Sequence, residues 1–212
     1  MSLIAKDLEY ARDDRALFTG LNFTINAGEV LQIEGPNGSG KTTLLRILCG
    51  LINADGGEIY WSDQDIQKDR YDYSNNASYI GHHDGLKGDC TPLENLALSH
   101  ALSSSKENFS AHEALEKVGM GGFEHQLCRT LSAGQRRRVA IARLLNSPAK
   151  LWILDEPFTA IDQAGISNLE SIITEHAHAD GMVILTSHHQ VNLPEINFST
   201  LVLGQTTNTQ HY

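Results

Sequence analysis

Hydrophobic and polar positions divide this chain into two kinds of segment. Short apolar runs such as "EVLQIEG" (29–35), "LWILD" (151–155) and "MVILTS" (182–187) have the character of buried strands. Longer segments carry apolar residues at helical spacing, as in "GKTTLLRILCGL" (40–51) and "QAGISNLESIITEHAHA" (163–179). Strands that alternate with helices predict an α/β fold, in which helices cover both faces of a parallel sheet.

The N-terminal part departs from this alternation. It reads mostly as further strands, in "SLIAKDLEY" (2–10), "LNFTI" (21–25) and "GGEIYWSDQDI" (56–66). Near the other end, "FSTLVLG" (198–204) predicts one more strand, and residues 205–212 are expected to form a frayed tail.

Residues 91–146 instead show a helical pattern. The stretch "TPLENLALSHAL" opens with Thr-Pro, which favours a helix start. Ser110 stands three residues before Glu113, the spacing of a capping box, and Ser132 is placed to cap "SAGQRRRVAIARLLN". Three helices are therefore predicted in this part of the chain.

Composition limits the classes of partner. A chain of 212 residues suits one domain with a buried core, and its formal net charge of −10 argues against nucleic acid, since phosphate binding needs a basic surface. No run of about 18 apolar residues occurs, so any contact with a membrane is expected through another subunit. The three cysteines lack a C-x-x-C spacing and are expected to be reduced and buried.

The stretch "GPNGSGKTT" matches G-x-x-x-x-G-K-[ST] between a predicted strand and a predicted helix. Its glycines let successive backbone N–H groups turn toward phosphate oxygens, and the helix N-terminus adds partial positive charge. Lys41 is expected to reach the β- and γ-phosphates of ATP, and Thr42 to offer its hydroxyl to Mg²⁺. The nucleotide-binding candidates here are Gly35, Pro36, Asn37, Gly38, Ser39, Gly40, Lys41, Thr42 and Thr43.

In "LWILDEP" (151–157) an apolar strand ends in two acids. Asp155 is expected to hold the magnesium, directly or through water, and Glu156 to orient and activate an attacking water molecule. An apolar run that ends in Asp-Glu is common by itself, but in the same chain as a phosphate loop it favours nucleotide hydrolysis.

A second helix start with free backbone donors occurs at "LSAGQRRR" (131–138). Its candidate nucleotide-binding residues are Ser132, Gly134 and Gln135. One nucleotide needs only one phosphate cradle, so two in one chain require an explanation. A head-to-tail homodimer provides it, because the second helix start of each copy then caps the γ-phosphate held by the other copy.

Together these motifs resemble the nucleotide-binding domain of ABC transporters, for which "LSAGQ" is the most specific sign. The resemblance covers nearly the whole chain. It implies one P-loop NTPase domain of the ABC ATPase type over residues 1–212. Within it the resemblance implies an antiparallel β subdomain and an inserted helical subdomain at about 84–147.

The resemblance also implies roles outside the two phosphate-binding motifs. "LTSHHQ" resembles the family's switch region, with His188 at the catalytic histidine that contacts the γ-phosphate. "FTAID" places Asp162 where two subunits would touch, whereas for His189 a solvated loop position is expected.

The sequence "YIGHHDG" resembles the family's sensor loop, in which glutamine usually senses magnesium and the attacking water. Here His83 stands at that position, which makes it the third candidate at the magnesium beside Thr42 and Asp155. A dedicated metal or haem site at the two histidines is the alternative interpretation. The adenine-stacking position also departs from the family's usual aromatic, with Tyr10 and Arg12 as the candidates.

Within the family, "GHHDGLK", "LSAGQRRRVAIARLL" and "PFTAID" are similar to the ATP-binding subunits of bacterial cytochrome c maturation. That similarity implies a peripheral ATPase on the cytoplasmic face of the inner membrane, bound to integral membrane permease subunits near residues 83–95. The work done would be haem export or release of a haem-carrying chaperone. Other interpretations are the ATPase of a small lipid or drug exporter, a soluble ABC ATPase, and a module that binds ATP without hydrolysis.

Overall fold

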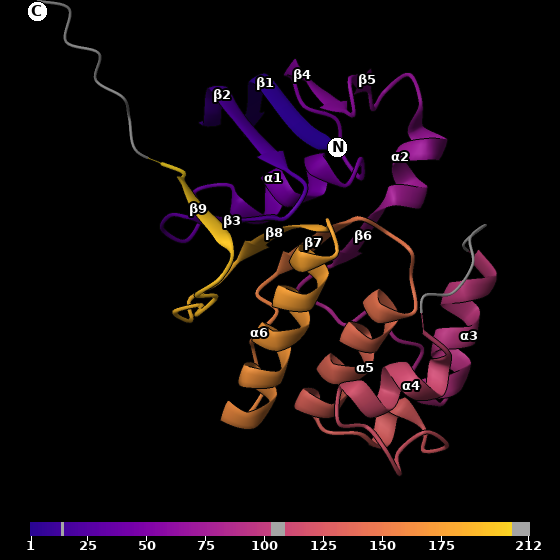
Figure 1. Ribbon diagram of the computed structural model, residues 1–212. Helices are drawn as coiled ribbons and strands as arrows, with labels where there is room; N and C mark the ends of the chain where they lie inside the picture. Colours follow the sequence, from indigo (N-terminus) through magenta and orange to yellow (C-terminus); the bar gives the residue numbers. More distant parts are fainter. Residues whose placement is uncertain (14, 103–108, 205–212) are drawn as a thin grey trace, which may run out of the picture.

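The computed structural model describes residues 1–212 except 14, 103–108 and 205–212, so the predicted tail lies outside the described residues. Two sheets form its framework (Figure 1). One is antiparallel with four strands, and the other is parallel with five. The predicted α/β fold class is confirmed.

The antiparallel sheet contains β1 (Ser2–Arg12), β2 (Arg15–Asn26), β4 (Gly56–Trp61) and β5 (Gln64–Asp65), in the order β2-β1-β4-β5. The prediction of one strand over 56–66 was wrong, because this stretch is a hairpin. Ser62 and Asp63 form its two-residue turn, with φ of 47° and 67°. Positive φ at both positions is the requirement of a type I′ turn, which sharply reverses the chain.

The parallel sheet has the order β6-β7-β8-β3-β9. Its strands are β3 (Glu29–Glu34), β6 (Ala77–Ile80), β7 (Leu151–Asp155), β8 (Met182–Thr186) and β9 (Asn197–Val202). The strands predicted at β3, β7, β8 and β9 are confirmed.

Two neighbouring elements were not predicted, namely the helix α2 (Arg70–Asn76) and the strand β6 that follows it. The sequence of α2, "RYDYSNN", has one buried residue, Tyr73, and therefore no apolar periodicity. Asp69 caps α2 by accepting a hydrogen bond from the backbone of Asp72 at 3.1 Å. Local capping and tertiary contact, rather than a hydrophobic pattern, define this helix.

Side chains of the parallel sheet enter two hydrophobic cores, one on each face. In β7, Leu151 and Ile153 pack with α1 (Lys41–Leu48) and the antiparallel sheet. Trp152 and Leu154 point to the other core, which α5 (Ala133–Leu145) and α6 (Gln163–His178) cover (Figure 1). Because all five residues of β7 are buried, this strand is held from both sides up to its end at Asp155.

The helices α3 (Pro92–Leu102), α4 (Ala111–Lys117) and α5 lie together at the end of the molecule away from the antiparallel sheet (Figure 1). A 3₁₀ helix, η1 (Cys128–Thr130), precedes α5. The two predicted caps are confirmed, and both are complete capping boxes. At the second, Gln135 N–H donates to Ser132 Oγ at 3.2 Å, and Ser132 N–H donates to Gln135 Oε1 at 2.8 Å.

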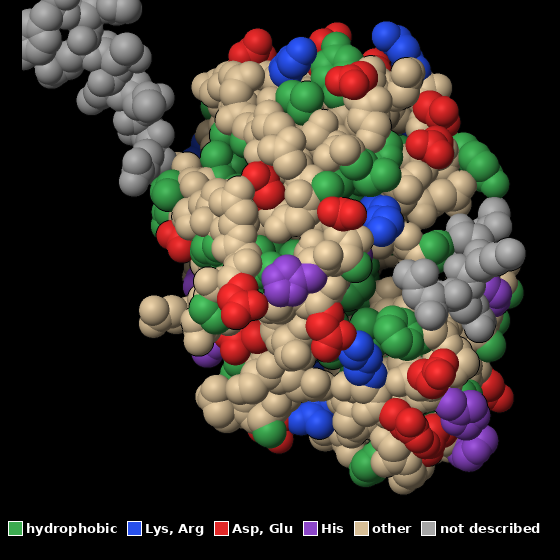
Figure 2. Space-filling model, viewed as in Figure 1, with side chains coloured by type: hydrophobic (Ala, Val, Ile, Leu, Met, Phe, Trp, Pro, Cys, Tyr) green, Lys and Arg blue, Asp and Glu red, His purple; other side chains and the backbone are tan. Residues whose placement is uncertain are grey.

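The chain has more acidic than basic residues, 26 Asp and Glu against 16 Lys and Arg. On the face shown in Figure 2, Asp and Glu side chains are scattered widely, and Lys and Arg form no continuous patch. None of the helices in the described part of the chain combines the length and the apolar character needed to cross a bilayer.

His176, near the end of α6, is a half-buried imidazole packed flat against Trp152. The two rings lie 3.7 Å apart between centroids with an interplanar angle of 7°. The Nε2 atom lies 3.2 Å from the carbonyl oxygen of Lys150, which accepts a hydrogen bond from the ring. Burial lowers the pKa of His176 to about 4, because the charged imidazolium would lose its hydration.

This lowered pKa makes folding stability depend on pH. The contribution of His176 is complete above the ordinary pKa of 6.5 and is lost as the pH falls toward about 4, because the unfolded chain takes up the proton first. In urea titrations, the unfolding free energy of the wild type should therefore fall more steeply over this range than that of His176→Phe. The expected difference is about 1 kcal/mol per pH unit. The acidic groups contribute equally to both proteins, so equal slopes would contradict the assignment.

Candidate functional site

A cavity of about 540 Å³ opens where the carboxyl ends of β7 and β8 meet the start of α1. Neighbouring parallel strands bring their C-terminal loops to one edge of a sheet, which is where α/β proteins bind ligands. Segments far apart in the sequence meet here. The cavity is lined by Arg12, Leu17, Asn37, Gly38, Gly40, Lys41, Thr42, Thr43, His82, Asp155, Glu156, Thr159 and His188.

The predicted phosphate loop has the conformation that its glycines allow. Gly38 and Gly40 have φ of 80° and 100°, and Gly40 is the N-cap of α1. A Cβ atom at Gly35 would come within 2.7 Å of the backbone oxygen of Leu203. Gly35 also has a positive φ, of 145°, so the loop needs glycine for its backbone conformation at all three positions and at Gly35 for close packing as well.

The Lys41 side chain folds back across this loop. Its Nζ donates to the carbonyl oxygen of Gly35 at 2.7 Å and to that of Pro36 at 3.3 Å. An ammonium group in this place lies at the positive end of the α1 dipole, so the loop and the helix start combine to favour an anion.

Asp155 is a buried carboxylate with two hydroxyl partners. Thr42 Oγ1 donates to Oδ2 at 2.9 Å, and Thr186 Oγ1 donates to Oδ1 at 2.8 Å. A carboxylate and a hydroxyl side by side, open to a cavity, are the hard oxygen ligands that Mg²⁺ prefers. Thr42 and Asp155, two of the three residues predicted at the metal, therefore lie together with suitable chemistry, whereas the third, His83, is not among the residues that line the cavity.

Glu156 and His188, predicted from separate motifs, are in contact. The backbone N–H of His188 donates to Glu156 Oε2 at 3.1 Å, and His188 Nε2 lies 3.5 Å from Oε1. The Glu156 backbone adopts a φ of 50°, which is uncommon for a residue with a side chain. The Glu156 N–H donates to Thr186 Oγ1 at 3.0 Å, which holds that conformation in place.

The histidine pair at the sensor loop is arranged differently from expectation. His82, rather than His83, is among the residues that line the cavity. Both side chains are exposed, and their rings meet edge to face with centroids 5.5 Å apart. Among the described residues, no group of three or more His, Cys, Asp or Glu side chains could hold a metal ion, so the alternative of a dedicated metal site has no support there.

Tyr10 and Arg12, the two candidates for stacking on the adenine, lie in different surroundings. Tyr10 packs against Phe18 with ring centroids 6.3 Å apart, whereas Arg12 lines the cavity beside Leu17. Of the two candidates, the Arg12 guanidinium is therefore the one that lines the cavity.

Ser132, Gly134 and Gln135 do not line this cavity. They form the start of α5, close to the loop that follows β7. A Cβ atom at Gly134 would lie 2.5 Å from the carbonyl oxygen of Ala160. In the same loop Asp162 caps α6 and forms an ion pair with Arg138 of α5. A single chain therefore does not bring its two predicted phosphate-binding helix starts together.

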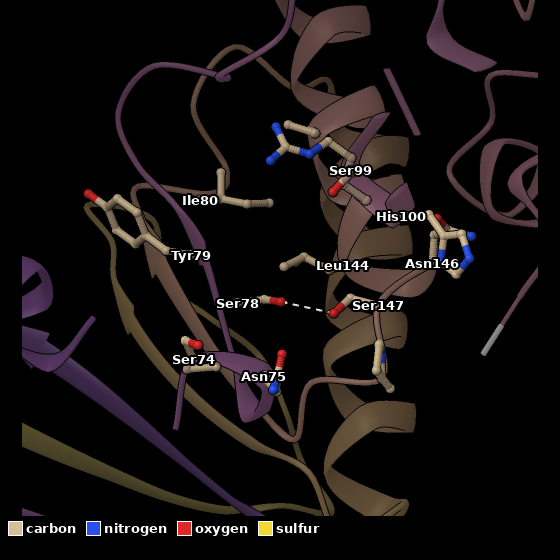
Figure 3. A pocket seen from close by; sticks show the side chains of 14 residues that line it. Ser74, Asn75, Ser78, Tyr79, Ile80, Ser99, His100, Leu144, Asn146 and Ser147 are labelled. Carbon is tan, nitrogen blue, oxygen red and sulfur yellow. Dashed lines mark hydrogen bonds between the residues drawn. The ribbon is translucent and has the colours of Figure 1, made fainter. Parts of the chain in front are cut away.

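A second cavity, of about 350 Å³, lies between α5, α3 and the segment of α2 and β6 (Figure 3). Serine and asparagine side chains face it, including Ser78 and Ser147, whose hydroxyl groups are 3.1 Å apart. Arg143 also lines this cavity.

Two residues that bind Asp155 or Glu156 were not recognised in the sequence. Thr186 is the polar residue that ends the apolar run "MVILT", and this was the available signal in the sequence. In the sheet it pairs with Asp155. Arg137 lies in a run of three arginines, a pattern typical of a solvated surface, yet it is only 3% exposed.

Comparisons with known proteins agree with this geometry. Residues 18–159 match the family described as ABC transporter. The cytochrome c biogenesis ATP-binding export protein CcmA of Yersinia pestis (bv. Antiqua, strain Nepal516) is 47% identical over 204 residues, which are 96% of this chain and 94% of that protein. CcmA of Escherichia coli (strain K12) is also 47% identical, over 96% of this chain and 97% of its own length.

Among solved structures, the ATP-binding protein of an ABC transporter from Pyrococcus furiosus superimposes with a TM-score of 0.81 at 26% identity, covering 96% of this chain and 98% of that one. The fold, the motifs and the full-length similarity lead to the same assignment. The chain belongs to the ABC transporter family of ATP-hydrolysing proteins and, within it, to the cytochrome c biogenesis ATP-binding export proteins.

Proposed function

We propose that this chain hydrolyses ATP as the peripheral subunit of an export complex that serves cytochrome c biogenesis. One observation carries the proposal: Asp155, Glu156 and His188 meet at the phosphate loop of Lys41, in a chain 47% identical to proteins named for that process. The alternative of a module that binds ATP without hydrolysis is disfavoured, because the residues expected for hydrolysis are present and in contact.

The cavity suits a triphosphate. Backbone N–H groups of the glycine-rich loop and Lys41 would bind the phosphates, and Arg12 would stack on the base. Magnesium, held by Thr42 and Asp155, would neutralise charge on the phosphate oxygens. Glu156 would accept the proton of the attacking water, and His188, in contact with Glu156, would orient the pair toward the γ-phosphate.

Replacing the proposed base tests this assignment. Glu156→Gln keeps the shape of the side chain and one acceptor oxygen, but it replaces the other oxygen with an amide NH2 and removes the charge and the basicity. The kcat for ATP hydrolysis should fall by roughly 10²–10⁴-fold, while the Kd for ATP, measured by equilibrium fluorescence, changes little. Glu170→Gln, which alters another partly buried carboxylate away from the cavity, is the matched control. Near-normal turnover by Glu156→Gln would remove this residue from the role.

We further propose that two copies close head to tail around two ATP molecules. Support comes from Ser132, Gly134 and Gln135, which lie outside the cavity of their own chain. The capping box leaves further backbone N–H groups of the α5 start without intrahelical partners, and such groups favour an anion. In a closed dimer they would meet the γ-phosphate bound by the partner.

Mixing two inactive variants distinguishes this arrangement from a site completed within one chain. Glu156→Gln lacks the base but has an intact α5 start. Ser132→Arg keeps the base, but its α5 start is blocked by the larger side chain. Random pairing gives half mixed dimers with one complete site each, so the mixture should recover about a quarter of the wild-type rate. Because Ser132→Arg also removes a helix cap, its folding is checked by circular dichroism. An inactive mixture of folded variants would contradict the proposed dimer.

The sensor function is proposed to involve His82 more than His83. Both imidazoles are exposed neighbours, but only His82 lines the cavity among the residues described there. His82→Ala should lower kcat by about tenfold because a polar contact beside the γ-phosphate is lost, and His83→Ala should lower it less. Steady-state ATPase assays compare the two variants directly. A larger loss in His83→Ala would restore the role that the family resemblance implies for that position.

The remaining proposals concern partners and place in the cell. The chain would bind integral membrane permease subunits at the cytoplasmic face of the bacterial inner membrane, through residues 83–95. Its hydrolysis would drive haem export or release of a haem-carrying chaperone. The permease that co-purifies with the chain distinguishes this branch from a lipid or drug exporter, and recovery of no permease would favour a soluble ABC ATPase.

A further inference from the structure

The side chain of Arg137 joins three segments that meet near the proposed hydrolysis site. It projects from α5, five residues after Ser132, and is 3% exposed. A buried guanidinium is costly unless its donors are satisfied, and burial lowers the pKa of Arg137 while neighbouring acids raise it. The partners that satisfy these donors indicate what the residue does.

Three of those partners belong to the turn that carries the proposed base. Nη2 donates to the carbonyl oxygen of Asp155 at 2.7 Å and to that of Glu156 at 2.8 Å. Nε donates to the carbonyl oxygen of Pro157 at 3.3 Å. One planar group thus binds three consecutive backbone carbonyls.

The other edge of the guanidinium binds the sensor loop, residues 79–85. Nη1 donates to the carbonyl oxygen of Gly81 at 2.8 Å and lies 3.6 Å from a carboxylate oxygen of Asp84. These two residues flank the histidine pair. Arg137 therefore connects the segment that holds His82 to the turn that holds Glu156.

The backbone of Glu156 depends on such support. Its φ of 50° is an unfavourable conformation for a residue with a Cβ atom, and such conformations persist only when the surroundings impose them. Thr186 holds the N–H of Glu156, and Arg137 holds its carbonyl oxygen. Both peptide groups that flank the proposed base are therefore fixed, which sets the direction of its carboxylate.

We propose that Arg137 is a positioning residue for ATP hydrolysis, which holds the Glu156 turn in its strained conformation and ties it to the sensor loop. The inference rests on the proposed function of Glu156. Arg137 does not line the cavity and touches no residue of the phosphate loop among the contacts described, so its loss should affect turnover rather than nucleotide affinity.

Arg137→Met tests the proposal, because it keeps a long side chain and removes every donor. Its kcat should fall by roughly tenfold or more, while the Kd for ATP stays within about threefold of the wild-type value. Rates are expressed per ATP-binding site and measured well below the melting temperature, so partial unfolding does not count as lost catalysis. Arg143→Met is the matched control. Arg143 is a half-buried arginine of α5, and it binds the carbonyl oxygens of Asp84 and Gly85 but not the turn after β7.

A kcat of Arg137→Met within about threefold of wild type would overturn the proposal, and so would an equal loss in Arg143→Met. If Arg137→Met does not fold, Arg137→Lys replaces it. A lysine ammonium keeps the charge but cannot bind both edges as the planar group does, so kcat should still fall with ATP affinity retained. Failure of the proposed function is a separate result, seen as absent hydrolysis in the wild type or full activity in Glu156→Gln.

Discussion

The buried carboxylate of Asp155 accepts one hydrogen bond from Thr42 at the start of α1 and another from Thr186 at the end of β8. Its two oxygens are almost removed from water, so the loss of either hydroxyl would leave a buried anion short of a partner. The same hydroxyl of Thr186 accepts a hydrogen bond from the backbone N–H of Glu156. One charged group thus fixes a helix start, a strand end and the turn that carries Glu156.

The two hydrophobic cores explain why this carboxylate can be held so firmly. Leu151 and Ile153 anchor β7 on one face of the sheet, and Trp152 and Leu154 anchor it on the other. A strand packed from both sides has little freedom to slide, because a shift of one residue would exchange the side chains of its two faces. The position of Asp155 at the end of β7 is therefore fixed by the apolar packing along the strand.

The sequence predicted the parts of the fold whose information is local. Apolar runs predicted the four longer parallel strands, and the capping boxes at Ser110 and Ser132 were visible from spacing alone. The hairpin after Trp61 was missed because its turn residues, Ser and Asp, lack the glycine that usually marks a type I′ turn.

Contacts between residues far apart in the sequence were harder to predict. The motifs predicted that Thr42, Asp155, Glu156 and His188 would be functional, and these residues do lie together. Side-chain direction was not available from spacing, so the sequence did not show that His82 faces the cavity. Nor did it show that the middle arginine of "RRR" points inward, since helical phase within a polar run has no apolar marker.

The capping box at the start of α5 has a consequence for association between copies. A serine hydroxyl has two acceptor sites and one proton, and the cap uses an acceptor site for the N–H of Gln135. The proton of Ser132 stays available to donate outward, while the helix end is already rigid in the isolated subunit. Little conformational entropy is then lost at this helix end when two copies bind. Less of the favourable contact free energy is therefore offset by ordering, and the affinity is higher.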